Sequence, residues 1–167
     1  MGGEPKVTVH GDAVFQRREW RVERGAWALA AVLIALALLG LFGAGPLSWT
    51  GAGSPDGLVH AEYERFTRER GPTTLEVRIA PEAAQQGRIR LGVSQDYLEA
   101  FMVQSITPQP STVVGGTDTL VYEFEVDRPD TPLTVTFNLQ GEQMWLHQGE
   151  LGVEGSAPVR FRQFVYP

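Results

Sequence analysis

Hydrophobic residues follow two different patterns along this chain. Residues 25–53 carry no ionisable side chain, whereas from residue 58 onward apolar and polar residues alternate in short stretches. A long uninterrupted apolar run predicts a membrane-spanning helix, and short alternating stretches predict half-buried β-strands. The sequence therefore predicts an N-terminal anchor followed by a β domain.

The length of the apolar run favours a helix that crosses a bilayer. An α-helix rises 1.5 Å per residue, so a hydrocarbon core of roughly 30 Å needs about 20 apolar residues. We place the span at residues 25–47, after a segment 1–24, with Trp27 and Trp49 as interfacial aromatic residues on either side. The alternative is a cleaved signal peptide, whose apolar region is usually about 7–15 residues long and follows a short basic segment. The longer run found here favours the anchor.

The charges beside the apolar run predict its orientation. Four arginines precede it, Arg17, Arg18, Arg21 and Arg24, whereas the first basic residue on the other side is Arg65. Basic residues are retained on the cytoplasmic side of a membrane. We therefore expect segment 1–24 to be cytoplasmic, the helix to lie in a bacterial inner membrane, and the C-terminal domain to be extracytoplasmic.

Strand patterns fill the region after a glycine-rich linker, which we place at residues 48–57. Residues 119–126 put Leu120, Tyr122 and Phe124 on one face and glutamates on the other, and residues 132–141 alternate in the same way. The same reading gives further strands at 58–66, 74–80, 87–93, 101–106, 143–153 and 158–166. Strands of this length and spacing predict an all-β domain over residues 58–167, an antiparallel sandwich of the immunoglobulin-like kind.

One stretch allows two interpretations. In residues 60–71, Tyr63 and Phe66 are three apart and Glu64 lies four before Arg68, which suits a helix leading away from the membrane. The alternation of Val59, Ala61 and Tyr63 favours a strand, which we prefer. Single helical turns at 81–87 and 95–100 are compatible with the same fold.

Composition excludes several functions. The chain has 14 basic and 20 acidic residues, a net charge of −6, so we expect no nucleic-acid partner. It has no cysteine, which rules out disulfides and thiolate chemistry. Met144 and His147 would point to opposite faces of a strand, which disfavours a shared metal ion. No catalytic motif is present, and we expect neither an enzyme nor a cofactor.

Two groups of residues are candidates for binding. Small residues on one side of the predicted membrane helix would allow another helix to approach closely: Ala30, Ala37, Gly40 and Ala44. An alanine-rich helix also shows such a stripe by chance. Arginines on two predicted edge strands would face a partner protein: Arg65, Arg68, Arg160 and Arg162. Protection of exposed edges and pairing with the domain's own glutamates are the commoner roles of such arginines.

The layout resembles that of small, uncharacterised bacterial single-pass membrane proteins. The likeness lies in the start "FQRREWRVERGAW", one hydrophobic helix and an exported β-sandwich. It is a likeness of architecture and implies no function. The predicted anchor, the exported globular domain and the lack of catalytic groups favour a non-enzymatic accessory or scaffold protein of a membrane complex, with the lipid bilayer and another membrane protein as partners. The alternative is a tethered binding domain for a small molecule or a cell-envelope carbohydrate, with Tyr97, Tyr122 and Trp145 as stacking surfaces.

Overall fold

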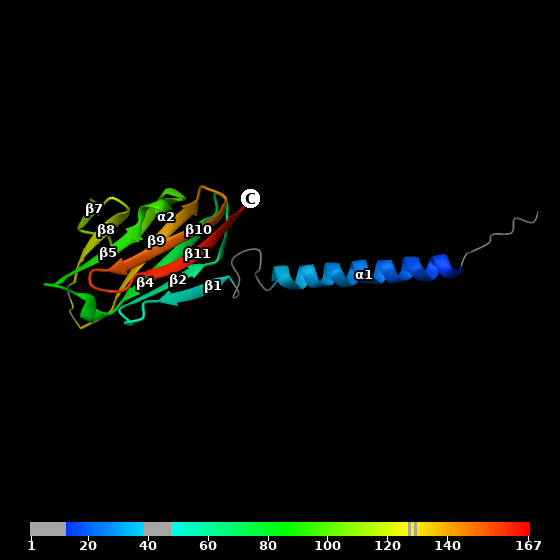
Figure 1. Cartoon of the computed structure of the whole chain (residues 1–167), viewed down its shortest axis with the longest axis horizontal. Helices are drawn as coiled ribbons and strands as arrows, with labels where there is room; N and C mark the ends of the chain where they lie inside the picture. The colour runs from blue at the N-terminus through cyan, green and yellow to red at the C-terminus, as the bar shows by residue number, and fades with distance from the viewer. Residues whose placement is uncertain (1–12, 39–47, 127, 129) are drawn as a thin grey trace, which may run out of the picture. The chain divides into compact units, whose positions relative to one another are not determined.

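The structure is a computed structural model that describes residues 13–38, 48–126, 128 and 130–167. It divides into two compact units, residues 1–38 and residues 39–167. The first unit contains a single described element, the helix α1 (Ala13–Leu38), and the second contains the β domain (Figure 1).

Helix α1 covers the arginine-rich segment and the first part of the apolar run. The remainder of the expected span, residues 39–47, lies outside the described residues. Within the described part of the chain, no helix combines the length and the apolar character needed to cross a membrane.

The β domain is a sandwich of two sheets (Figure 1). The first sheet has the strand order β1-β2-β4-β9-β6, with the bounds β1 Trp49–Gly53, β2 Val59–Glu64, β4 Pro72–Ile79, β9 Leu133–Gly141 and β6 Phe101–Thr107. The second sheet has the order β3-β11-β10-β5-β8-β7, with the bounds β3 Phe66–Arg68, β11 Val159–Tyr166, β10 Trp145–Val153, β5 Arg88–Ser94, β8 Thr119–Glu125 and β7 Thr112–Gly115. Two short turns complete it, η1 Pro81–Ala83 and α2 Gln95–Glu99.

Alternating side chains form the core between the sheets. On β4, Leu75, Val77 and Ile79 are at most 1% exposed, and on β5 the same holds for Ile89, Leu91 and Val93. Successive strand residues point to opposite faces, so each strand gives one face to the core and the other to solvent. The all-β sandwich expected from the sequence is thus confirmed.

A buried hydrogen-bond chain and an aromatic cluster join the two sheets near α2. The Tyr97 hydroxyl donates to Gln163 Oε1 at 2.8 Å, Gln163 Nε2 donates to Thr73 Oγ1 at 2.9 Å, and Thr73 Oγ1 donates to Glu64 Oε2 at 3.0 Å. Burial raises the pKa of Tyr97, whose ring packs against Phe101 and Phe161. Because Gln163 belongs to the second sheet and Thr73 to the first, this chain fixes their relative position.

Two segments differ from the sequence-based expectation. Residues 49–53, expected to be part of a linker, form β1, which pairs with β2 from Trp49↔Glu64 to Gly53↔His60. Residues 112–115, which the sequence did not mark as a strand, form the edge strand β7. Glycine-rich sequence weakened both strand signals, although backbone pairing needs no side chain.

Other expectations are borne out. The stretch 58–66 forms strands, not the alternative helix, and the turns at η1 and α2 fall where single helical turns were expected. Strands β8 and β9 belong to different sheets, so the proline-containing loop between them is a crossover.

A turn at the end of the sandwich is fixed by the carboxylate of Asp56. It accepts hydrogen bonds from the Ser54 hydroxyl, the Leu58 amide, the Ser156 hydroxyl and the Ala157 amide. The bond from Ser54 contributes most to lowering the pKa of Asp56, followed by that from Leu58. The carboxylate therefore ties the turn before β2 to the turn before β11.

Gly149 makes room for the ring of Phe161 on the adjacent strand. A Cβ at Gly149 would lie 2.3 Å from Phe161 Cζ, and the ring is confined by Tyr63 and Tyr97. We predict that Gly149→Ala lowers the free energy of unfolding by about 1–3 kcal/mol, because overpacking forces the ring to move. Gly115→Ala is the control, since its Cβ would lie 3.8 Å from the nearest atom. Urea unfolding of both variants tests this, and equal stabilities would contradict it.

The Asp56 carboxylate makes stability depend on pH. Its pKa is lowered in the folded protein, so its contribution is present above the unfolded value of about 3.9 and is lost as the pH falls toward the folded value. We expect Asp56→Asn to be less stable than the wild type at pH ~7, with the difference shrinking below pH ~4.

Urea midpoints at several pH values measure this difference. Asp130→Asn is the control, because among the described residues the Asp130 carboxylate has no hydrogen bond. A difference between Asp56→Asn and the wild type that stays constant down to pH ~2 would refute the role given to the carboxylate.

Candidate functional site

A shallow groove on the outer face of the second sheet is the strongest candidate site. The strand register sets four residues side by side across β10, β5, β8 and β7: Gly152, Gly92, Val121 and Val114. The two glycines leave bare backbone as the floor, and the two valines make one end apolar. The groove has a volume of about 520 Å³.

Close neighbours leave little room for a side chain at either floor glycine. A Cβ at Gly92 would lie 3.0 Å from Thr119 Cγ2, and one at Gly152 would lie 3.3 Å from the Cα of Pro158. Glycine inside a strand weakens the strand, and it often marks a place where another group approaches the backbone. Glycines inside the predicted strands 87–93 and 143–153 are the sequence signal for the groove.

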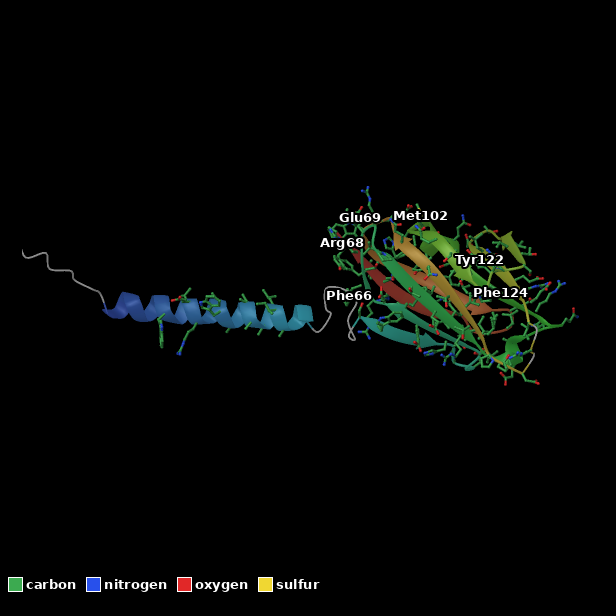
Figure 2. All side chains as sticks on the ribbon, turned by 180° about the vertical axis from the view of Figure 1, so that it is seen from behind. Phe66, Arg68, Glu69, Met102, Tyr122 and Phe124 are labelled. Atoms are coloured by element: carbon green, nitrogen blue, oxygen red, sulfur yellow. The ribbon has the colours of Figure 1, made fainter. Side chains whose placement is uncertain are left out.

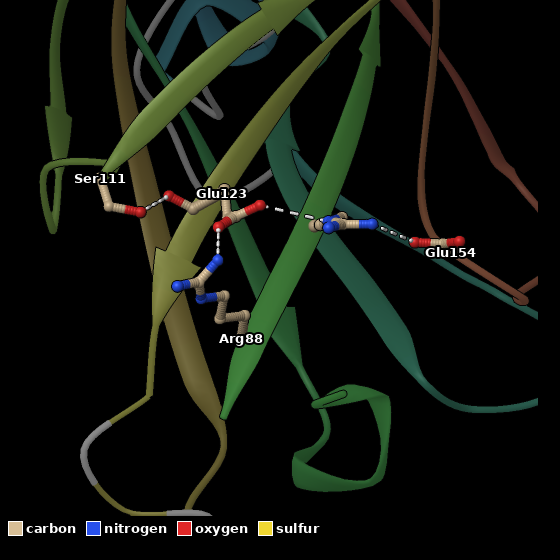
Figure 3. Close-up of polar contacts among 5 residues, drawn as sticks. Arg88, Ser111, Glu123 and Glu154 are labelled. Atoms are coloured by element: carbon tan, nitrogen blue, oxygen red, sulfur yellow. Dashed lines mark hydrogen bonds and ion pairs between the residues drawn. The ribbon is translucent and has the colours of Figure 1, made fainter. Parts of the chain in front are cut away.

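Ion pairs form one rim of the groove (Figure 3). The Glu123 carboxylate forms ion pairs with Arg88 Nη1 at 2.9 Å and with Arg90 Nε at 3.2 Å. Arg90 Nη1 forms a further ion pair with Glu154 Oε2 at 3.2 Å. The hydrogen bond from Arg90 to Glu123 contributes most to raising the pKa of Arg90, followed by the hydrogen bond to Glu154. The hydroxyl of Ser111 donates to the backbone oxygen of Glu123 at 3.0 Å, which links the start of β7 to the network.

Glu123 is the centre of this network. Its side chain is 16% exposed, whereas those of Arg88 and Arg90 are 55% and 53% exposed. Exposed ion pairs contribute roughly 0–1 kcal/mol each, so the main effect of the network is to hold the arginines in fixed positions. A glycine floor with an apolar end and a fixed polar rim is compatible with the composition of a protein interface, which has an apolar centre and a polar rim.

A second, polar hollow adjoins the groove. It has a volume of about 400 Å³ and shares Arg90 and Glu154 with the groove, while Gln85, Gln86 and Arg88 line its other side. The charged rim therefore separates an apolar surface from a polar one.

The expected helix–helix stripe is described only in part. Ala30 and Ala37 lie in α1, whereas Gly40 and Ala44 lie outside the described residues. The contact itself stays a prediction.

The four candidate arginines lie close to one edge of the second sheet. Arg65 lies between β2 and β3, Arg68 lies on β3, and Arg160 and Arg162 lie on the neighbouring strand β11. Strand β3 runs parallel to β11 and pairs only with Phe164–Tyr166, so it leaves the part of β11 that holds Arg160 and Arg162 without a neighbour on that side in the sheet. Arg160 Nε pairs with Glu150 at 2.9 Å, and Arg65 donates to the Thr50 hydroxyl. These contacts agree with local pairing, and a partner-facing role stays a prediction.

The three aromatic residues expected to stack on a ligand do not form one surface. Tyr97 and Tyr122 are 1% and 5% exposed and belong to the core, whereas Trp145 is 66% exposed. The expected three-residue platform is therefore wrong, because Tyr97 and Tyr122 lie at inward positions. Among the described residues, no group of three histidine or acidic side chains could hold a metal ion.

Comparisons with known proteins assign no family to this chain. No family model and no curated protein matches the sequence. Among solved structures, the chain is similar to a cohesin module from a family 33 glycoside hydrolase of Clostridium perfringens ATCC13124, with a TM-score of 0.39 and 12% sequence identity. The match covers 70% of this chain and 98% of the cohesin module. At this TM-score, the likeness carries no argument about function.

Removing the central carboxylate tests the ion network. We predict that Glu123→Gln lowers the free energy of unfolding by about 1 kcal/mol, because two arginines lose their charged acceptor. Glu125→Gln on the same strand is the control, since Glu125 has no ion pair among the described residues. Urea unfolding at low and high salt measures both, and the deficit of Glu123→Gln should shrink at high salt. Equal stabilities at low salt would contradict the prediction.

Proposed function

We propose that this protein is a membrane-anchored, non-enzymatic accessory or scaffold protein whose extracytoplasmic β-sandwich binds a partner protein through the groove on its second sheet. The observation that carries the proposal is the groove itself, with its glycine floor, its apolar end and its fixed charged rim. The uncharged run at residues 25–47 and the arginines before it support the anchor and its orientation.

The edge strand β7 makes the groove suitable for a protein partner. Val113 and Val114 are 50% and 55% exposed, and β7 pairs with β8 on one side only. Val114 pairs with Val121 and faces the groove, whereas Val113 pairs with the buried Tyr122 on the opposite face. A partner would cover the valines and meet the charged rim with polar groups of its own.

A carbohydrate ligand has less support at this site. The residues that line the groove include no aromatic side chain on which a sugar ring could stack. The groove is also open along the sheet and does not enclose a small molecule on all sides. We therefore place a protein partner first.

Adjacent valines offer a matched pair of variants. We predict that Val114→Glu abolishes recovery of a stoichiometric partner when the full chain is purified from its native membrane in mild detergent, because the new charge lies in the groove. Val113→Glu should recover the partner as the wild type does, since the two positions are similarly exposed on opposite faces. Quantitative mass spectrometry of the purified material gives the readout.

Two results would overturn the proposal. One is a wild-type chain that emerges without a stoichiometric partner. The other is a partner that both variants retain equally, which would place the interaction elsewhere on the protein.

A further inference from the structure

Exposed apolar side chains gather at one end of the sandwich, which we call the proximal end. It is the end at which β1, β6 and β10 begin. The exposed residues there are Trp49 at the start of β1, Met102 at the start of β6, and the run Met144–Leu146 at the start of β10. Figure 2 shows Phe66, Arg68, Glu69 and Met102 at this end, with Tyr122 and Phe124 further along the sandwich. On the central strands β4, β5 and β9 burial follows the strand alternation, so the exposed side chains at the proximal end need a separate explanation.

Trp145 is held in an unusual backbone conformation. Its φ is +90°, in the region that favours glycine, and its side chain is 66% exposed. A bulky residue at positive φ is strained, and such strain concentrates at functional positions. Met144 and Leu146 on either side are 38% and 53% exposed, so the crossover from β9 to β10 presents three successive apolar side chains to solvent.

The exposed side chains are spread over the end and do not line one pocket. Trp49 and Met102 lie on the two edge strands of the first sheet, β1 and β6, which are four strand spacings or roughly 19 Å apart. Trp145 belongs to the second sheet, roughly 10 Å from the first. A broad surface can contact all three positions at once, whereas a small ligand cannot.

The proposed anchor, which directly precedes β1, indicates that this broad surface is a membrane. The proposed anchor ends at residue 47, and β1 begins at Trp49. The first residue of the sandwich is therefore two residues from the end of the span. This step rests on the proposed function, since it requires the anchor to be embedded in a bilayer.

We propose that the proximal end of the sandwich lies on the outer interface of the same bilayer, with Trp145 and its two neighbours inserted among the lipid headgroups. Tryptophan is enriched at this depth because its ring is apolar and its indole N–H is polar. The contact fixes the orientation of the domain above the membrane.

Charges at the proximal end indicate which lipid is needed. Arg65, Arg68 and Arg70 lie there, but so do four acidic side chains, Glu64, Glu69, Glu99 and Glu142. Cations do not predominate, so attraction to anionic lipid contributes little. We therefore expect contact with a zwitterionic bilayer, driven by apolar insertion.

Fluorescence quenching tests the contact in the full chain. In the first variant, Trp20, Trp27 and Trp49 are replaced by Phe, which leaves Trp145 as the sole tryptophan. The variant is reconstituted in phosphatidylcholine vesicles, with or without bromine on the acyl chains. We expect brominated lipid to reduce the fluorescence of Trp145 by about two-fold, since interfacial side chains reach roughly 5–10 Å into the boundary. Replacing part of the lipid with an anionic one should not increase the quenching.

Two matched variants separate the possible failures. One keeps only Trp27, in the proposed anchor. The other lacks all four native tryptophans and carries Thr131→Trp in the exposed loop before β9, at the opposite end of the sandwich. Circular dichroism establishes that each variant retains its β structure.

The outcomes are distinct. Quenching of Trp27 and Trp145 but not of the tryptophan at 131 supports the proposal. Quenching of Trp27 alone overturns it and leaves the anchor intact. If Trp27 is not quenched, the anchor fails and the proposed function fails with it. Equal quenching of Trp145 and the tryptophan at 131 also overturns the proposal, because it shows no preferred orientation.

Discussion

The hydrogen-bond chain from Tyr97 through Gln163 and Thr73 to Glu64 is the constraint on which the rest of the sandwich depends. Apolar contact alone would let two sheets slide over each other, since hydrophobic burial is not directional. A buried amide must be satisfied at both ends, and Gln163, 1% exposed, finds Tyr97 on one side and Thr73 on the other. The sheets therefore have one favoured relative position.

The same cluster determines what reaches the surface. Phe161 packs between Tyr63 and Tyr97 and occupies the space above Gly149, which keeps the inward positions of β10 and β11 in place. The alternate residues of β10 must then face outward, among them Gly152. The packing of the inner face of β10 therefore also determines which of its residues line the groove on the outer face.

Residue alternation predicted the inner face of the domain well. Tyr122 and Phe124 alternate with Glu123, and the structure buries the first two and turns the third outward. The same rule argued against Tyr122 as a ligand surface, because its position in the pattern is an inward one. Expecting a stacking role for it gave more weight to residue type than to the pattern.

The candidate groove needed information that alternation does not contain. Gly92 and Gly152 are far apart in the sequence and meet only through the register of β5 with β10. Trp145 presents a similar difficulty, since a regular strand beginning there would not place the residue at positive φ. Pairing across strands and local strain both arise from tertiary structure, so sequence pattern alone identified neither.

The two proposed surfaces constrain each other. If the proximal end lies on the bilayer, the strands rise from the membrane and the groove faces sideways, along the membrane plane. Gly92 pairs with Gly152, which lies seven residues after Trp145 on β10, or roughly 23 Å along the strand from the proximal end. A partner able to reach it must therefore present its own binding surface at about that height above the same bilayer. This geometry favours a membrane-bound partner over a freely diffusing one, because anchoring both proteins in one membrane raises their effective concentration.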